Sequence, residues 1–439
     1  MKKVLSILLA AAMILGMSAC TIQLSTTNTI PGRPGSNDGP DGPTPYEELT
    51  LEEKMAYKTV VELVPATDYS ADLLAPAQDA SSGLWGYITL QGEWKVAPKY
   101  KTAGVFSGDY AIVNNNYDDC IYVNRDGEEV LSAVDKKPIR SATVFSDGMA
   151  AVSTAMEQVQ KSFYINAEGK SAITLKKLPA TRGVNYKTLQ YVELASPFRD
   201  GKAVIMRTTN ATLVATNEDR YPEMAYVLDS TGMVLAPLPA GMDASPAGFD
   251  DNMLVVVKNG DGLYGLASDA GALVAPCVYK SIAHCEGGMY LVQDADGLYG
   301  YMNKSGHRVI GCIYKDAMPF SEGLAAVNDG EGWGFINDIG ETVIPCEYDN
   351  VAALKTGCSG ADSDKGAFSS GIAVVSKGKY WGFIDQENNI IMAAEADECP
   401  VMAVCGGYIS FKLNGSYGVI TTEGKYVLKP GYGAIGEFR

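Results

Sequence analysis

Short apolar runs separated by polar turn residues recur along most of the chain. One well-preserved example contains such runs at residues 324–327, 333–336 and 343–345. Runs of this length, bounded by glycine, asparagine and aspartate, are typical of β-strands joined by tight turns. The pattern therefore predicts an all-β fold class, built from small antiparallel meanders of three strands each.

The middle run of each meander contains an aromatic residue followed by glycine. Six such pairs are present, namely Trp85 and Gly86, Tyr264 and Gly265, Tyr299 and Gly300, Trp333 and Gly334, Trp381 and Gly382, and Tyr417 and Gly418. Degenerate copies begin at Cys120, Ser162 and Ala225. The best-preserved copies are spaced by about 35 residues, a period that signals a repeat array. We therefore predict about nine repeats, whose apolar faces are buried only when the units stack.

A turn signature supports this alignment. Each copy places a turn-forming residue four positions after its start and, three positions later, glycine or in one case asparagine. These pairs are Thr89/Gly92, Asn124/Gly127, Asn166/Gly169, Asp229/Gly232, Ser268/Gly271, Asn303/Gly306, Asn337/Gly340, Asp385/Asn388 and Thr421/Gly424. The first residue suits the start of a type I turn, and the last suits a positive φ.

The aromatic–glycine pair has a packing explanation. Side chains alternate across a strand, so the aromatic residue and the glycine face opposite sides. The aromatic ring supplies apolar area for contact with a neighbouring unit, and the glycine permits a close backbone approach. We therefore interpret the six pairs as structural repeat residues and assign them no catalytic role.

The C-terminal end of the repeat decides between two architectures. Phe438 stands where the first strand of a tenth unit would begin. In a closed propeller-like ring, a strand from the other end of the array would complete that unit. Residues 57–64 are predicted to be helical and are poor candidates for it. We therefore favour an open superhelical stack, with the closed ring as the alternative.

The first 65 residues differ from the repeat. Lys2 and Lys3 precede an apolar stretch that is too short to span a bilayer, so residues 1–19 are predicted to be a signal peptide. The stretch ends at Cys20 in a sequence that resembles a bacterial lipobox, which implies lipidation of Cys20. Residues 20–45 form a predicted flexible tether. Thr50 and Glu53 form a capping box that opens a helix to about Val64 within a helical lead-in at 46–65. The β array spans residues 66–439.

The aromatic–glycine pairs, turn glycines and flanking proline and phenylalanine positions together resemble the WG-repeat family of bacterial proteins. The resemblance covers about residues 83–439. It implies an all-β array, often found in secreted or envelope proteins. It implies no particular activity and provides no catalytic residues.

The net charge and the sequence motifs argue against several classes of function. The formal net charge is −17, which argues against nucleic acid as a partner. No motif for catalysis, cofactor binding or metal binding is found, so we expect a non-enzyme with no cofactor and no metal site. We expect no catalytic or metal role for His284 or His307, and His307 follows a turn glycine and should face water. Acidic turns such as residues 328–332, 294–297 and 114–119 are interpreted as turn chemistry, with calcium binding as the alternative.

The cysteines and the irregular segments leave some questions open. Cys277, Cys312 and Cys346 occupy one column of the repeat and are predicted to be small, buried apolar side chains. A disulfide between Cys399 and Cys405 stays possible in an exported protein. Three insertions, at 176–193, 208–222 and 354–367, interrupt the repeat. They are either binding loops or the result of neutral drift.

Together these patterns predict a non-enzymatic binding scaffold, lipid-anchored to the bacterial cell membrane on its extracytoplasmic side. Its partner would be an envelope or extracellular macromolecule, either protein or glycan. A carbohydrate- or cell-wall-binding protein is the alternative, favoured if tryptophan or tyrosine is exposed outside the repeat columns. An enzyme built on the insertions comes third, favoured if carboxylates converge in a pocket near 176–193 or 208–222.

Overall fold

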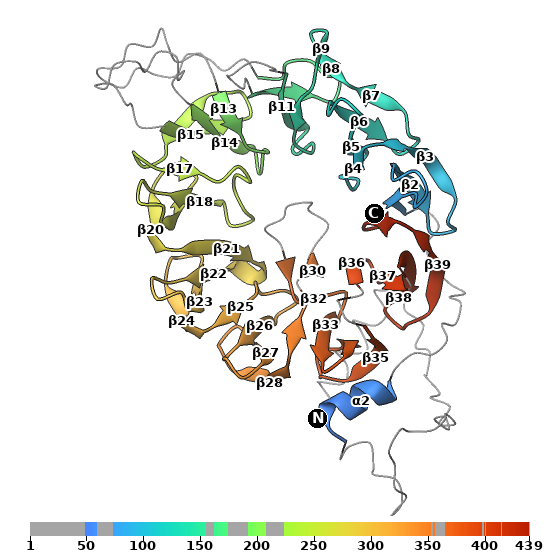
Figure 1. Cartoon of the computed structure of the whole chain (residues 1–439). Coiled ribbons are helices and arrows are strands. Elements are labelled where there is room, and N and C mark those ends of the chain that lie inside the picture. Colours follow the sequence, from blue (N-terminus) through green and yellow to red (C-terminus); the bar gives the residue numbers. More distant parts are fainter. Residues whose placement is uncertain are drawn as a thin grey trace, which may run out of the picture. The chain divides into compact units, whose positions relative to one another are not determined.

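The computed structural model describes residues 49–58, 73–154, 162–173, 192–207, 224–352, 354–355, 365–396, 399, 401–413 and 415–438. All of these except Leu49 belong to one compact unit, Thr50–Arg439. Within the described ranges the chain forms nine antiparallel sheets of three to five strands around a common centre, together with two two-stranded hairpins (Figure 1). We name these sheets blade 1 to blade 9 in chain order. The prediction of an all-β array of about nine meanders is confirmed.

Each blade is described below from its innermost to its outermost strand. Blade 1 contains β40 (Ala434–Ile435), β1 (Leu74–Gln78), β2 (Trp85–Thr89) and β3 (Trp94–Tyr100). Blade 2 contains β4 (Thr102–Ala103), β5 (Tyr110–Asn114), β6 (Cys120–Asn124) and β7 (Glu129–Leu131). The described part of blade 3 contains β10 (Ser141–Ala142), β11 (Met149–Ser153) and β12 (Ser162–Asn166). A small hairpin of β8 (Ala133–Val134) and β9 (Lys137–Pro138) lies between blades 2 and 3 in the chain.

The next three blades keep the same plan. Blade 4 contains β13 (Val192–Ala195), β14 (Lys202–Arg207), β15 (Met224–Asp229) and β16 (Val234–Pro237). Blade 5 contains β17 (Asp243–Ala244), β18 (Leu254–Lys258), β19 (Tyr264–Ser268) and β20 (Leu273–Tyr279). Blade 6 contains β21 (Ser281–Cys285), the 3₁₀ turn η3 (Glu286–Gly288), β22 (Met289–Gln293), β23 (Tyr299–Asn303) and β24 (Arg308–Tyr314).

The last three blades complete the array. Blade 7 contains β25 (Asp316–Ala317), β26 (Ala325–Asn328), β27 (Trp333–Ile336) and β28 (Thr342–Tyr348). Blade 8 contains β29 (Asn350–Val351), β33 (Ile372–Lys377), β34 (Tyr380–Ile384) and β35 (Ile390–Glu395), with β32 (Phe368–Ser369) also paired to β33. Blade 9 contains β36 (Val401–Cys405), β37 (Tyr408–Leu413), β38 (Ser416–Thr421) and β39 (Tyr426–Tyr432). A hairpin of β30 (Leu354–Lys355) and β31 (Lys365–Gly366) extends from blade 8.

Each blade has an innermost strand that the sequence pattern did not predict, and in six of the nine blades this strand is two residues long within the described ranges. In blade 7 this strand is β25, whose two residues pair with the end of β26. The three meander strands expected from the repeat follow it outward. Most blades therefore have four strands rather than three. The two-residue strands were not predicted because two residues are too few to show a period-2 pattern.

The array closes into a ring, as in the alternative prediction, and the open stack that we favoured is not formed. β40 pairs antiparallel with β1, placing Ile435 opposite Ala77 and Ala434 opposite Gln78. The C-terminal segment therefore provides the innermost strand of blade 1, next to β1, and the C-terminus lies at this blade (Figure 1). The closing partner is β1, which lies beyond the helical segment considered from the sequence. Ile435 is fully buried, and Phe438 packs in the same apolar cluster as Val419 and Ile88.

All nine predicted turns are formed. The residue expected to need a positive φ has one between 66° and 85° in every repeat, including Asn388. In blade 6, the Asn303 side-chain oxygen accepts hydrogen bonds from the backbone amides of Ser305 and His307, at 3.0 and 3.1 Å. The turn between the third and fourth strands is therefore fixed by its first and last residues, as the sequence signature indicated.

The glycine of each aromatic–glycine pair lies against the backbone of the outermost strand. At Gly334, an added Cβ would lie 2.5 Å from the Ile344 carbonyl oxygen and 2.7 Å from the Cys346 nitrogen. At Gly86, Gly265, Gly300 and Gly418, the atom nearest to an added Cβ would be a backbone carbonyl oxygen, at 2.3 to 2.6 Å. The register shifts next to each of these glycines, because the outermost strand bulges toward it. A side chain has no room at these positions.

A tyrosine–phenylalanine contact recurs between neighbouring blades. Tyr301 of β23 packs against Phe320 of blade 7 with ring centroids 4.6 Å apart, and its hydroxyl donates a 2.7 Å hydrogen bond to the Met318 carbonyl. Three further pairs repeat this arrangement, namely Tyr87 with Phe106, Tyr122 with Phe145, and Tyr164 with Phe198. Their hydroxyls donate to the carbonyls of Gly104, Thr143 and Ser196. Each pair buries apolar area while giving the buried hydroxyl a partner.

These tyrosines predict loss of stability in alkaline solution. Burial raises the pKa of Tyr87, Tyr122, Tyr164 and Tyr301 above the ordinary value. The unfolded chain therefore loses phenolic protons that the folded chain retains, so the free energy of unfolding should fall as pH rises above about 10. We expect the circular dichroism transition and the tyrosinate absorbance to change together in a pH titration. Gradual ionisation of these tyrosines at pH 10 to 11 in a fully folded chain would contradict the prediction.

A short helix covers the outer edge of blade 8. Helix α2 (Leu51–Tyr57) begins with the predicted capping box, in which the Thr50 hydroxyl accepts from the Glu53 amide. It ends at Tyr57 rather than near Val64. The carbonyl of the following Lys58 accepts a 3.1 Å hydrogen bond from the Ala393 amide of β35. The helix therefore acts as the outer neighbour of an edge strand (Figure 1).

Helix α2 fits blade 8 because the outermost strand of that blade does not bulge beside Gly382. β35 has no proline, and it pairs in regular register with β34 around Gly382. The nearest neighbour of Gly382 is the Met55 methyl group, which would lie 2.7 Å from an added Cβ. Met55 is fully buried among residues of blades 7 and 8. A side chain of the helix thus fills the space next to this glycine.

Candidate functional site

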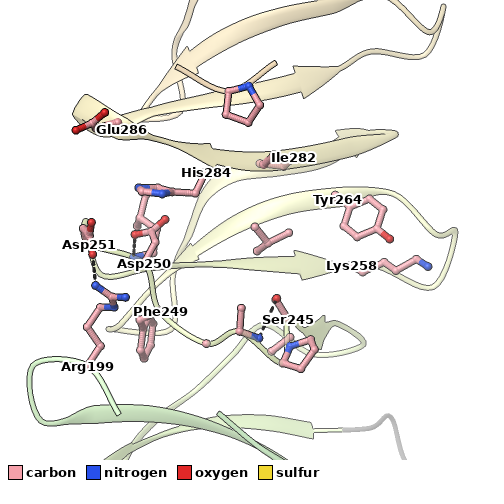
Figure 2. Close-up of a pocket in the computed structure, with 18 of the residues that line it drawn as sticks. Arg199, Ser245, Phe249, Asp250, Asp251, Lys258, Tyr264, Ile282, His284 and Glu286 are labelled. Atoms are coloured by element: carbon pink, nitrogen blue, oxygen red, sulfur yellow. Dashed lines mark hydrogen bonds and ion pairs between the residues drawn. The ribbon is translucent and has the colours of Figure 1, made fainter. Parts of the chain in front are cut away.

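A hollow of about 870 Å³ lies on the inner side of blades 4 to 8. Most of its lining comes from blade 5, from the loop at residues 243–251 and from strands β18 and β19, and the rest comes from single residues or short runs of blades 4, 6, 7 and 8. Figure 2 shows these side chains between the strands of blades 4, 5 and 6. Ligand sites in proteins generally have a volume of this order.

The hollow occurs where the tyrosine–phenylalanine contact is missing. In blade 5, Leu266 occupies the position of the tyrosine, and in blade 6 the turn η3 lies between the two inner strands, where blade 7 has Phe320. Tyr290 of β22 takes over the packing there and is fully buried beside Leu254 and Leu266. Blades 5 and 6 therefore pack through Tyr290, where four other pairs of neighbouring blades pack through a tyrosine–phenylalanine pair.

Tyr290 lies at the centre of a group of four polar side chains at this interface. Its hydroxyl donates a 2.5 Å hydrogen bond to Asp250 Oδ2 and accepts one of 3.2 Å from Asn252 Nδ2. The other Asp250 oxygen accepts from the backbone amides of Asn252 and Leu254. Burial, together with the hydrogen bond to and the charge of Asp250, raises the pKa of the Tyr290 hydroxyl. The hydroxyl therefore stays protonated and acts as a structural donor.

His284 belongs to the same group. Its Nε2 atom lies 3.4 Å from Asn252 Nδ2, and its ring packs edge-on against Tyr290 at 5.6 Å between centroids. The neighbouring Cys285 is fully buried, and burial raises the pKa of its thiol to about 12. A thiol held neutral in this way is a poor nucleophile. The arrangement connects two blades and does not resemble a histidine-activated nucleophile.

Carboxylates surround the hollow and link its blades. The lining includes five of them, at Asp243, Asp250, Asp251, Glu286 and Glu322, against two cationic side chains, Arg199 and Lys258. Arg199 forms an ion pair with Asp251 across blades 4 and 5 (Figure 2). Glu286 accepts a 2.6 Å hydrogen bond from the Glu322 amide, and Glu322 accepts from the amides of Ser370 and Gly371. The hollow is therefore acidic, and its turns are joined from blade 6 to blade 8.

The walls between these charges are apolar or aromatic. Phe249, Val256, Ile282 and Pro319 line the hollow, and the Tyr264 ring lies 5.2 Å from the Lys258 ammonium. Such a surface can hold apolar groups while its carboxylates attract cationic ones. In the described parts of the chain, no cluster of three or more potential metal ligands occurs.

Of the residues named in the sequence analysis, Tyr264 and His284 line the hollow. The six aromatic residues of the repeat lie on the third strand of their blades, and five of them stand opposite a tyrosine of the outermost strand. These five are Trp85, Tyr264, Tyr299, Trp333 and Tyr417. Trp381 instead stands opposite Ala394 in the blade that holds α2. Cys20 lies outside the described residues.

Other predicted features are distributed over the ring. His307 is exposed, as expected, whereas Cys277, Cys312 and Cys346 are partly buried. The six cysteines that the structure describes are free thiols, Cys399 among them. The side chain of Cys405 lies outside the described residues. Most of the insertion at 176–193, all of 208–222 and the middle of 354–367 lie outside them too.

The group of Asp250, Asn252, His284 and Tyr290 was not identified from the sequence. The available signal was an absence, because Leu266 stands at the position where blades 1, 2, 3 and 6 have a tyrosine that packs on a phenylalanine. A missing packing pair predicts a gap or a replacement, but it does not name the replacing residue.

The sheets and their closure define the class of this protein as an all-β, propeller-like repeat protein. A family model described as WG containing repeat matches residues 85–117, 299–332, 333–358 and 417–439. WG repeats are thus present in four places, which include the blades in which the sequence signature is best preserved. No helix within the described ranges is both long and apolar enough to cross a bilayer.

Two solved structures are similar to this chain at low sequence identity. The computationally designed Ika8 protein is 12% identical, with a TM-score of 0.38 over 83% of this chain and 98% of that protein. BamB from Moraxella catarrhalis is 12% identical, with a TM-score of 0.36 over 75% of this chain and 92% of that protein. A search of curated proteins finds no match.

Proposed function

We propose that this protein is a lipid-anchored cell-envelope protein that binds another macromolecule through its WG-repeat ring without catalysing a reaction. The observation that carries the proposal is the hollow of about 870 Å³ over blades 4 to 8. Its apolar walls and surrounding carboxylates favour a protein segment with apolar and basic side chains. The N-terminal sequence, with its apolar stretch before Cys20, supports export and anchoring.

The chemistry around the hollow supports binding over catalysis. His284, Tyr290 and Asp250 are engaged with one another or with the turn of blade 5. Cys285 is buried, with its pKa raised to about 12. These groups stabilise the interface between two blades, so the potential acids, bases and nucleophiles at this place have structural partners.

Filling the hollow should abolish capture of the partner. Ala247 is an exposed residue of its lining, so Ala247→Trp would occupy the space without disturbing a buried side chain. We expect this variant to lower recovery of envelope proteins in a pull-down by roughly tenfold, as for blocked hot-spot pockets. The bait would be the chain from residue 46 onward, which includes all residues of the compact unit.

Ala272→Trp provides the matched control, because Ala272 is an exposed alanine of the same blade outside the hollow. Equal recovery with both variants and the unaltered chain would exclude the hollow as the binding site. Failure to capture any envelope component, combined with hydrolysis of a glycan or peptide by the unaltered chain, would overturn the proposal as a whole.

Glycan binding is the second candidate function, favoured by one observation. Tyr117 is 80% exposed and lies outside the repeat columns, in the turn between β5 and β6. An exposed ring can stack on the apolar face of a sugar. If the partner is a cell-wall glycan, Tyr117→Ala should remove binding to it and Ala247→Trp should not.

A further inference from the structure

The innermost strand of blade 6 is longer than most innermost strands of the ring. Strand β21 has five residues, whereas the innermost strands of blades 1, 2, 3, 5, 7 and 8 have two residues each within the described ranges. All five residues of β21 pair with β22 without a register shift. In the part of the chain that the structure describes, β21 ends its sheet, and no other strand pairs with its inner side. β21 is therefore a regular edge strand on the inner side of the ring.

The two other long innermost strands differ from β21. In blade 4, β13 has a register shift between Val192 and Leu194. In blade 9, β36 has a register shift between Val401 and Ala403, and β30 of the hairpin that extends from blade 8 lies against it. Bulges and covering segments keep an edge strand from pairing with another chain. Among the described residues, β21 shows neither feature, so it can serve as the template for an added strand.

The inner side of β21 belongs to the hollow over blades 4 to 8. Ile282 and Ala283 line the hollow, and so does Glu286, which follows the strand directly. Ile282 packs on the apolar cluster between blades 5 and 6, and Ala283 packs on the cluster between blades 6 and 7. A strand added to β21 would continue blade 6 inward, so one of its faces would meet blade 5 and the other blade 7.

The two walls that such a strand would meet differ in chemistry. The blade 5 side presents the apolar side chains of Phe249 and Val256. On the blade 7 side, Glu322 lies next to Glu286, whose carboxylate accepts a hydrogen bond from the Glu322 amide. An apolar wall favours apolar side chains, and two neighbouring carboxylates favour basic ones. Because successive side chains of a strand point to opposite faces, the segment that fits best alternates apolar and basic residues.

Two carboxylates on the blade 5 side are already engaged. Asp250 accepts the hydrogen bond from Tyr290, and Asp251 forms the ion pair with Arg199 (Figure 2). Their charges are therefore offset or held within the interface between blades. The carboxylates next to the end of β21 are the ones placed to receive basic side chains.

We propose that the hollow binds an extended segment of another protein as an added strand on β21. The segment alternates apolar side chains, which lie toward Phe249 and Val256, with basic side chains, which lie toward Glu286 and Glu322. A strand as long as β21 covers about 17 Å. Main-chain hydrogen bonds to β21 provide affinity, and the alternate side chains provide specificity. This inference rests on the proposed function, since it takes the hollow as the site that binds a protein segment.

A synthetic peptide of three Lys-Val repeats tests the pattern. It would carry a fluorescent label and uncharged ends, and fluorescence anisotropy would measure its binding to the chain from Thr21 onward, which retains every described residue. We expect saturable binding that weakens as salt is added. The matched control has three lysines followed by three valines. It keeps the composition without the alternation, and it should bind roughly tenfold more weakly.

N-methylation of the peptide distinguishes an added strand from contacts of side chains alone. The N–H groups of successive residues point to opposite edges of a strand, so methylating every lysine amide blocks one edge and methylating every valine amide blocks the other. One methylated peptide should bind like the unmodified one. The other should bind roughly tenfold more weakly or not at all, because it loses its hydrogen bonds to β21. Equal binding of the two would overturn the inference and leave the proposed function standing.

Glu286→Gln tests the placement of the basic side chains. Glutamine can still accept the hydrogen bond from the Glu322 amide, so the change removes only the charge. We expect the dissociation constant of the Lys-Val peptide to rise about threefold, as for the loss of one exposed charge pair. Glu341→Gln is the matched control, because Glu341 is an exposed carboxylate outside the hollow that also accepts a hydrogen bond, from Asn337. Equal effects of the two changes would contradict the placement.

The outcomes separate this inference from the function on which it rests. If the Lys-Val peptide does not bind the unaltered chain, the inference is wrong, whatever the pull-down recovers. If Ala247→Trp leaves the capture of envelope proteins unchanged, the proposed binding site itself is wrong. Slower hydrogen exchange in residues 281–285 on addition of the peptide would support strand addition directly, and unchanged exchange there would contradict it.

Discussion

Replacing Gly334 with alanine is expected to lower the free energy of unfolding by about 3 kcal/mol, at the upper end of the cost of overpacking a core. The new Cβ would lie 2.5 Å from the Ile344 carbonyl oxygen and 2.7 Å from the Cys346 nitrogen. Both are backbone atoms of the bulged strand β28, so relief requires a shift of the strand itself. Urea unfolding followed by circular dichroism would measure the change.

Gly382→Ala is the informative comparison. It makes the same substitution at the same position of the repeat, but the nearest atom is the Met55 methyl group at 2.7 Å. The end of a flexible side chain moves more easily than a strand, so the cost should be clearly smaller than at Gly334. Equal costs would mean that the bulge is not what requires glycine in this repeat.

Removal of residues 434–438 is expected to cause the largest loss of stability, roughly 5 kcal/mol or more. Deleting buried aromatic and aliphatic side chains costs about 2 to 5 kcal/mol each, and both Ile435 and Phe438 are buried. The inner edge of β1 would also lose its partner. This loss is comparable with the whole stability of many domains, so thermal unfolding should begin at a much lower temperature.

A disulfide between β1 and β40 tests the same ring closure by strengthening it instead of removing it. Gln78 and Ala434 stand opposite each other on β1 and β40. Opposite residues of antiparallel strands have Cα atoms about 4.5 to 5.5 Å apart, within reach of a disulfide. Gln78→Cys combined with Ala434→Cys should therefore oxidise to an intramolecular disulfide that raises the temperature of unfolding. If the array were open, the two thiols would stay reduced and the deletion would affect only the end units.

The repeat and its turns could be predicted because each depends on local residues. A positive φ at the turn position limits the choice to glycine or asparagine, and this restriction recurs in all nine repeats. Alternation along a strand likewise separates the aromatic residue from the glycine. The degenerate copies at Cys120, Ser162 and Ala225 were found by the same turn signature, and they form β6, β12 and β15.

The features that could not be predicted depend on contacts distant in sequence. The innermost strands are too short for a pattern, and ring closure depends on whether the two ends of the array meet. The early end of α2 reflects the hydrogen bond between Lys58 and Ala393. The hollow depends on Tyr290 replacing a ring pair, and the residues it meets, Asp250 and Asn252, belong to another blade.

The closure of blade 1 has a consequence for the order of folding. The Tyr432 hydroxyl donates a hydrogen bond to the Gly92 carbonyl across 340 residues of chain, close to the point where β40 joins β1. Contacts of such long range must overcome the entropy of a large loop before they add stability. While the polypeptide is being synthesised, most blades can assemble from neighbouring segments, whereas the first blade waits for its final strand. Until that strand arrives, the nascent chain presents an open strand edge, which makes this the interval in which self-association is most dangerous.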